Sequence, residues 1–139
     1  MKLELLSRTD LAVRALRYLR GSGRQTSTEI ADAIGSTTKF VPHVMSPLVA
    51  AGWVDSTRGP HGGYSINDAA AQASVLAVIE AVEGPTVSGK CVLAGTPCPA
   101  LSRCSLHDSW SSARSALVEE LNAIPVLEEG AHGNNSART

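Results

Sequence analysis

The 139-residue chain has few aromatic residues and no long apolar run. Two tryptophans, two tyrosines and one phenylalanine make up 4% of the sequence, so Leu, Val and Ala must supply most of a hydrophobic core. No uncharged apolar stretch approaches the roughly 18 residues of a transmembrane helix, and Glu4 and Asp10 interrupt the place where a signal peptide is apolar. We therefore expect a cytoplasmic protein with no membrane partner.

Cysteine is also scarce, and its few copies are clustered. The only cysteines are Cys91, Cys98 and Cys104. A disulfide framework would leave one of them unpaired, and a reducing cytosol opposes such a framework. Clustered cysteines in that compartment more often bind a metal or respond to redox chemistry.

The composition otherwise fits one folded domain with an extension, because the chain is 43% hydrophobic and 18% charged. The net charge of −1 conceals an asymmetry between the two halves. Residues 1–66 contain eight Lys/Arg against five Asp/Glu, whereas residues 67–139 contain four against eight. The N-terminal half is therefore the part suited to a polyanion such as nucleic acid.

Residues 1–52 show the pattern of three helices. Apolar residues recur at helical spacing from Leu5 to Leu19. Thr26 and Glu29 form a capping-box signature for a second helix that ends at Gly35, and Ser36 or Thr37 is placed to cap a third helix reaching residues 50–52. Two short helices joined through a glycine are typical of a helix-turn-helix.

Residues 53–66 have the pattern of a β-hairpin. Two strand-like runs, 53–56 and 64–66, flank a turn rich in Gly and Pro at 58–63. A hairpin attached to a helix-turn-helix is a wing. The sequence therefore predicts a mainly α-helical fold with a small β-hairpin, in which residues 1–67 form a winged helix-turn-helix DNA-binding domain.

The remaining residues are predicted to form four segments. These are a connecting helix within 68–85, a cysteine-containing loop at 86–102, a long helix at 103–124 and a flexible tail at 125–139. Apolar residues on the long helix fall at steps of three and four, a seam suited to packing on a second copy of the same helix. The seam consists of Leu106, Trp110, Ala113, Leu117 and Leu121.

Three groups of residues, taken in order, resemble the Rrf2 family of bacterial winged-helix regulators. The first is the wing sequence Arg58-Gly59-Pro60-His61-Gly62-Gly63-Tyr64. The second is the helix Val78-Ile79-Glu80-Ala81-Val82-Glu83-Gly84, and the third is the cysteine set. The resemblance implies a homodimer that binds a palindromic operator in double-stranded DNA and carries an iron-sulfur cluster. Thiolates are suitable ligands for such a cluster.

The resemblance assigns Cys91, Cys98 and Cys104 as cluster ligands and leaves the fourth ligand open. Asp10 stands where the nitric-oxide-sensing NsrR-type members, the closest match, have an aspartate that reaches the cluster from the partner subunit, which favours a 4Fe-4S cluster. His107 stands where IscR-type members have a histidine ligand, which would favour a 2Fe-2S cluster. Two simpler interpretations stand beside these: Asp10 forms an i, i+4 ion pair with Arg14, and His107 is solvated.

The winged-helix interpretation identifies candidate DNA contacts. The start of the third helix would enter the major groove, and the wing would contact the minor groove. The predicted contacts are Thr37, Thr38, Lys39, His43 and Arg58. Arg14, one turn after Asp10, is a candidate for coupling the cluster to the DNA-binding domain. Pro42 and Pro47 depart from the family pattern and predict a kink in the recognition helix.

These features together predict a regulator rather than an enzyme. Our hypothesis is a repressor whose cluster is nitrosylated by nitric oxide. A first alternative is an IscR-like regulator of cluster assembly, iron or redox state, with a 2Fe-2S cluster. A second is a regulator that uses zinc or bare thiols. A small electron carrier or thiol enzyme is the alternative of another class, and the wing and the basic N-terminal half argue against it.

Overall fold

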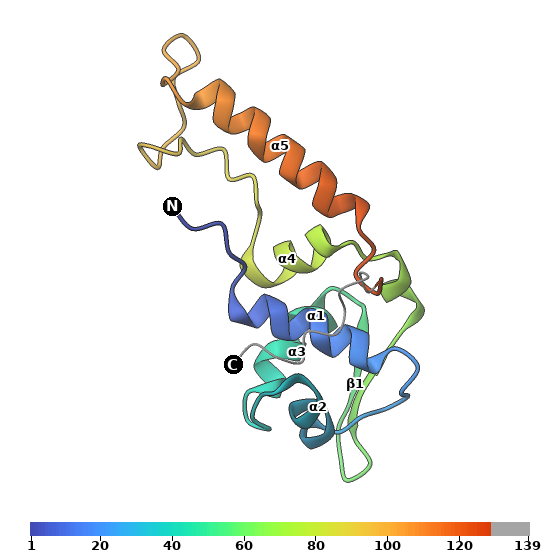
Figure 1. Ribbon diagram of the computed structural model, residues 1–139. Coiled ribbons are helices and arrows are strands. Elements are labelled where there is room, and N and C mark those ends of the chain that lie inside the picture. Colours follow the sequence, from blue (N-terminus) through green and yellow to red (C-terminus); the bar gives the residue numbers. More distant parts are fainter. Residues whose placement is uncertain (129–139) are drawn as a thin grey trace.

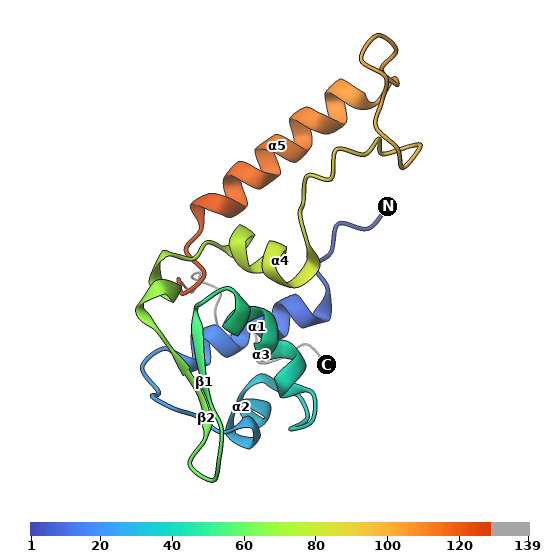
Figure 2. The ribbon, with the colours of Figure 1, turned by 180° about the vertical axis from the view of Figure 1, so that it is seen from behind.

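The computed structural model describes residues 1–128. Its helices and its hairpin form two parts of unequal size. The elements are α1 (Ser7–Leu19), α2 (Ser27–Ile34), α3 (Val41–Ala50), β1 (Val54–Thr57), β2 (Gly63–Ile66), the 3-10 helix η1 (Asp68–Gln72), α4 (Val75–Glu83) and α5 (His107–Ala123). Figures 1 and 2 show α1, α2, α3 and the hairpin at one end and the loop before α5 at the opposite end. The predicted winged helix-turn-helix fold is therefore confirmed.

Helix α1 lies at the centre of the hydrophobic core. Its apolar face, Ala12, Ala15, Leu16 and Leu19, is fully buried and packs on α2, α3 and α4. Leu5 and Leu6 precede the helix and stay about half exposed. No helix within residues 1–128 combines the length and the apolar character that a membrane span requires.

Helix α2 begins and ends as the sequence predicts. The Thr26 hydroxyl accepts a hydrogen bond from the Glu29 N–H at 3.2 Å, and the Glu29 carboxylate accepts one from the Thr26 N–H at 2.8 Å. These two bonds satisfy N–H groups that lack a partner within the helix. Gly35 ends the helix with a φ of 74°, a conformation that favours glycine.

Helix α3 begins later than predicted, at Val41 rather than after Ser36 or Thr37. The backbone oxygen and the hydroxyl of Thr37 both accept from the Phe40 N–H, at 3.0 and 3.3 Å, and this turn precedes the helix. Pro42 is the second helical residue, where the missing N–H costs no intrahelical bond. The helix continues through Pro47 to Ala50.

The wing is a two-stranded antiparallel hairpin that is fixed to the helical domain. Val54 pairs with Ile66, and Thr57 pairs with Gly63. Tyr64 also exchanges two backbone hydrogen bonds with Gln25, at 2.8 and 2.9 Å, which ties β2 to the segment before α2. A Cβ at Gly63 would collide with the backbone of Gln25, and its φ of 152° also favours glycine.

Helix α4 connects the two ends of the molecule. The Ser74 hydroxyl caps it by accepting from the Ala77 N–H at 3.0 Å. At its other end, Glu83 accepts from the Leu6 N–H at 3.2 Å and from the buried Thr9 hydroxyl, so it caps the start of α1. Glu80 accepts from the Thr86 N–H at 2.8 Å, where the cysteine loop begins.

Helix α5 is shorter than predicted and has no buried residue. It begins at His107 instead of residue 103, and residues 84–106 form no helix or strand. Leu106 and Leu117 of the apolar seam remain 39% and 47% exposed in the single chain. Most of the seam is therefore available to a second molecule.

Residues 125–128 are not the free tail that the sequence predicts. Val126 is fully buried, and its backbone oxygen accepts from Arg17 Nε at 3.0 Å. A second nitrogen of Arg17 donates to the Glu128 oxygen at 2.9 Å. These residues therefore close the core against α1, and the rest of the predicted tail, 129–139, lies outside the described residues.

Candidate metal centre and nucleic-acid interface

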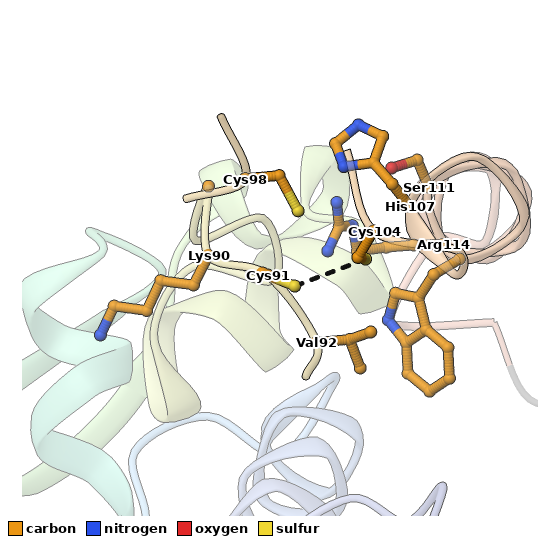
Figure 3. Close-up of a pocket in the computed structure, with 10 residues that line it drawn as sticks. Lys90, Cys91, Val92, Cys98, Cys104, His107, Ser111 and Arg114 are labelled. Carbon is orange, nitrogen blue, oxygen red and sulfur yellow. Dashed lines mark hydrogen bonds between the residues drawn. The ribbon is translucent and has the colours of Figure 1, made fainter. Parts of the chain in front are cut away.

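The three cysteines converge beside the start of α5. Their Sγ atoms all lie within 4.8 Å of one another, and the Sγ atoms of Cys91 and Cys104 are 3.6 Å apart (Figure 3). All three are free thiols that are partly buried. Nowhere else in residues 1–128 do three His, Cys, Asp or Glu side chains gather in this way. The sequence expectation that these cysteines form one set is consistent with this arrangement.

Backbone hydrogen bonds position two of the three sulfurs. The Cys91 N–H donates to the Thr96 oxygen at 2.8 Å, and the Gly95 N–H donates to the Cys91 oxygen at 3.0 Å, so residues 91–96 form a closed turn. The Leu93 N–H points at Cys91 Sγ from 3.4 Å. Cys104 lies three residues before α5, and its oxygen accepts from the His107 N–H at 3.2 Å.

These surroundings give the cysteines different acidities. Backbone N–H groups of Ala94 and Leu93 lower the pKa of the Cys91 thiol to about 7. The Cys104 backbone lowers the pKa of Cys98, but the hydrogen bond to the Cys91 sulfur and burial outweigh it, so the pKa of Cys98 is raised. Cys91 is therefore the more acidic of the two, and the thiolate is the form that binds metals.

The sulfurs face a cavity of about 250 Å³ that the basic side chain of Arg114 also lines. His107, Trp110, Ser111 and Arg114 line it from α5, and Lys90 lines it from the loop. Figure 3 shows the Arg114 side chain extending toward the cysteines. Neither Lys90 nor Arg114 forms an ion pair with a residue in 1–128. Arg114 can therefore offset the negative charge of thiolates, whereas the Lys90 side chain extends away from the sulfurs in Figure 3.

Lys90 and Arg114 were not found from the sequence. His107, Ser111 and Arg114 follow one another at steps of four and three residues, so they share a helical face. That spacing is the signal that places Arg114 on the face of α5 beside His107.

The donor set fits a thiophilic metal group. Zinc and iron-sulfur clusters are commonly bound by cysteine thiolates. A cationic side chain in the cavity stabilises the negative charge of such thiolates. In a tetrahedral site with metal–sulfur bonds of about 2.3 Å, the ligand sulfurs lie roughly 3.8 Å apart. The Cys91–Cys104 separation of 3.6 Å is close to that value, and the other two separations are within 4.8 Å. A cluster distributes its cysteines over separate irons and spreads them further.

The two candidate fourth ligands occupy different places. His107 lines the cavity, but its ring nitrogens do not belong to the group of mutually close ligand atoms. Asp10 is exposed on α1 and forms an ion pair with Arg14 at 3.0 Å, the simpler interpretation of that residue. Within a single chain, Asp10 is therefore not brought to the sulfurs.

The predicted DNA contacts are all exposed at the opposite end of the molecule. Thr37, Thr38 and Lys39 lie in the turn before α3 rather than inside the helix. His43 is in the first turn of α3, where its ring lies 5.7 Å from that of Phe40. Arg58 is in the loop between β1 and β2. The structure thus leaves each of them accessible, on the helix-turn-helix and the wing.

The fold and the site together define a winged helix-turn-helix protein with a separate three-cysteine centre. The family model of Rrf2, described as an iron-dependent transcriptional regulator, matches residues 5–128. The chain belongs to the Rrf2 family of DNA-binding transcriptional regulators.

Individual relatives agree with this assignment. The chain is 30% identical over 127 residues to protein aau3 of Rhizobium meliloti, which covers 89% of this chain and 82% of the relative. It is also 30% identical over 129 residues to the HTH-type transcriptional regulator IscR of Vibrio vulnificus, covering 91% of this chain and 76% of the relative. Both matches extend from the DNA-binding part into the cysteine-containing part.

Solved structures show the same fold. CymR, the global cysteine regulator of B. subtilis, superposes with a TM-score of 0.71 at 21% identity, over 90% of this chain and 94% of that one. T. potens IscR superposes with a TM-score of 0.68 at 23% identity, over 91% and 85% of the respective chains.

Proposed function

We propose that this protein is a cytoplasmic, homodimeric repressor that carries an iron-sulfur cluster and responds to nitric oxide. The observation that carries the proposal is the convergence of three thiols on one cavity, at the end of the molecule opposite the DNA-binding elements. Such a separation suits a regulator in which one end receives a signal and the other binds DNA. The proposed target is a palindromic operator in double-stranded DNA.

The cluster would be held by Cys91, Cys98 and Cys104, with Asp10 of the partner subunit as fourth ligand. When bound, the cluster supplies iron that reacts with nitric oxide. The protein's own contribution is to hold three thiolates in one place, to balance their charge with Arg114, and to shelter them in the cavity. We favour a 4Fe-4S cluster because an aspartate stands at the NsrR-type position.

The link between the two ends would run through α1 and α4. Glu83 of α4 binds the start of α1, and Glu80 binds the start of the cysteine loop. Asp10 and Arg14 follow on the next turn of α1, so a change in the loop reaches a helix that packs directly on α3. Arg14 is our candidate coupling residue because its ion pair must change if Asp10 binds iron.

The substitution Cys98→Ala tests the sensing role. It removes one ligand without touching the DNA-binding end, so we expect loss of iron and loss of nitric-oxide-dependent release from the operator. Ser105→Ala, an exposed residue beside Cys104, is the matched control. A Cys98→Ala protein that keeps its iron and still releases DNA with nitric oxide would refute the assignment.

The fourth ligand is tested by comparing Asp10→Ala with His107→Ala. If Asp10 is the ligand, only Asp10→Ala changes the visible spectrum and the cluster mass of protein prepared without oxygen. If His107 is the ligand, the pattern reverses, and the IscR-like alternative with a 2Fe-2S cluster gains support.

A second candidate is a regulator that binds a single zinc ion. The close spacing of the sulfurs favours it, because mutual distances within 4.8 Å are near those of a tetrahedral ion. Metal analysis of anaerobically purified protein separates the two candidates: iron with equimolar sulfide supports the cluster, and stoichiometric zinc without sulfide supports the ion.

A further inference from the structure

We propose that Cys91 and Cys104 form a thiol modification site in the metal-free chain. They would react with a low-molecular-weight disulfide to give an internal Cys91–Cys104 disulfide, and Cys98 would remain a free thiol. This inference goes beyond the proposed function, since it concerns the chain when no metal is bound and does not depend on which metal binds.

The first support is geometric. The two Sγ atoms are 3.6 Å apart, and a disulfide bond is about 2.05 Å long, so the sulfurs must approach by roughly 1.5 Å. Both residues lie in the segment 84–106, which has no helix or strand to resist such a movement. A small adjustment of side chains and loop is therefore sufficient.

The second support concerns Cys98, whose Sγ lies within 4.8 Å of the other two but whose backbone is restricted. Pro97 and Pro99 flank it, which fixes the backbone φ on both sides and restricts Cys98 itself to extended conformations. Cys91 and Cys104 have no proline beside them. In Figure 3 the dashed line joins Cys91 to Cys104, and Cys98 approaches from a separate part of the loop.

The third support is access and charge. Both residues line the cavity, which gives a small molecule a route to the sulfurs. Arg114 lines the same cavity and extends toward the cysteines, which favours a disulfide that carries carboxylates. The Leu93 N–H donates to Cys91 Sγ at 3.4 Å, and we take Cys91 as the attacking residue on this geometry.

The reaction is a thiol–disulfide exchange in two steps. The Cys91 thiolate attacks a disulfide RS–SR, forms a Cys91–S–SR bond and releases one RS⁻. The Cys104 thiolate then attacks the Cys91 sulfur, forms the internal disulfide and releases the second RS⁻. The two cysteines lose two electrons and two protons, and RS–SR becomes two molecules of RSH.

The consequence is that oxidation of the two cysteines prevents metal binding. The internal disulfide consumes two of the three candidate ligand sulfurs, so the oxidised chain cannot rebuild the centre until a thiol reduces it. Only Cys98 then remains available.

The test uses the full chain, reduced and freed of metal, with oxidised glutathione as the probe. After alkylation of free thiols, trypsin cleaves after Lys90 and Arg103 and separates Cys91 and Cys98 from Cys104. We expect a disulfide-linked pair of peptides in which Cys98 carries the alkyl group. The variant Cys104→Ser should accumulate a glutathione adduct on Cys91, and Cys98→Ser should form the linked pair as fast as the unmodified sequence.

A linked pair that disappears in Cys98→Ser, or an adduct that forms on Cys98 in place of Cys91, would overturn the proposal. Circular dichroism of each variant verifies that it is folded. Because no metal is present, this outcome is independent of whether the chain binds a cluster, so failure here and failure of the proposed function are distinguishable.

Discussion

Cys91, Cys98 and Cys104 share one cavity but have different surroundings. Backbone N–H groups favour the charged form of Cys91, whereas the neighbouring Cys91 sulfur and burial raise the pKa of Cys98. The sequence identified these three residues through their clustering and through the family resemblance. It could not rank their acidities, because the ranking depends on which N–H groups the loop turns toward each sulfur.

The first prediction concerns the reactivity of these thiols with pH. The thiolate is the nucleophile, so a lowered pKa makes a cysteine reactive at lower pH. In metal-free protein, we expect the alkylation rate of Cys91 by iodoacetamide to rise with a midpoint at about pH 7, and that of Cys98 to rise only at higher pH. Mass spectrometry of pulse-labelled peptides gives both profiles, and a Cys98 midpoint below that of Cys91 would contradict this order.

Among the elements, those with local signals were predicted best. The capping box of Thr26 and Glu29 and the glycine at position 35 fix α2 by bonds within a few residues, and the hairpin follows from its Gly/Pro turn. The errors concern segments whose structure depends on contacts with residues that are distant in the sequence. Residues 125–128 pack into the core because Val126 is buried there and Arg17 donates a hydrogen bond to their backbone. No local sequence pattern predicts either contact.

The start of α3 shows a different kind of error. Thr37 was a plausible helix cap, but its hydroxyl and oxygen both close a turn with Phe40, which delays the helix to Val41. Pro42 suits the resulting first turn and therefore does not disrupt the helix. The two prolines that seemed to depart from the pattern are compatible with a continuous α3.

The second prediction tests the contact between α4 and α1. Glu83→Ala leaves the Leu6 N–H and the buried Thr9 hydroxyl without their acceptor, so we expect a loss of about 1–3 kcal/mol in the free energy of unfolding. Urea denaturation of the reduced, metal-free protein measures it. Asp32→Ala, an exposed acid on α2, should change stability by less than about 0.5 kcal/mol. Equal stabilities of the two variants would contradict this role of Glu83.

At the scale of the whole molecule, the apolar seam on α5 is partly exposed in the single chain. Trp110, Ala113 and Leu117 line an apolar groove together with Met1 and Leu3. The sequence predicted this seam and its use in a homodimer. The structure adds that the N-terminal segment contributes to the same surface.

The third prediction therefore concerns assembly. Leu117→Glu places a charge in the centre of the seam, and we expect the dimer to dissociate to half its mass because the desolvated carboxylate has no partner. Sedimentation velocity measures the mass. Ser115→Glu, on the other side of α5, should remain a dimer. Dissociation of both variants, or of neither, would place the subunit contact elsewhere.

The fourth prediction concerns the DNA-binding end. If Lys39 and Arg58 each contact a phosphate, removing either charge lowers the slope of log K against log salt by about 0.9 per contact. Fluorescence anisotropy with an operator fragment at several salt concentrations provides the slopes. Lys90→Ala, a cation of the cysteine cavity, should leave the slope unchanged. Unchanged slopes in Lys39→Ala and Arg58→Ala would show that neither residue contacts a DNA phosphate.

The central claim is that three cysteines hold an iron-sulfur cluster that controls DNA binding. The most direct measurement is the iron and acid-labile sulfide content of protein purified without oxygen, together with its native mass and its operator affinity before and after nitric oxide. We predict iron and sulfide in equal amounts, lost in Cys98→Ala, and weaker operator binding after nitric oxide. Protein that contains neither element and still releases its operator with nitric oxide would contradict the account.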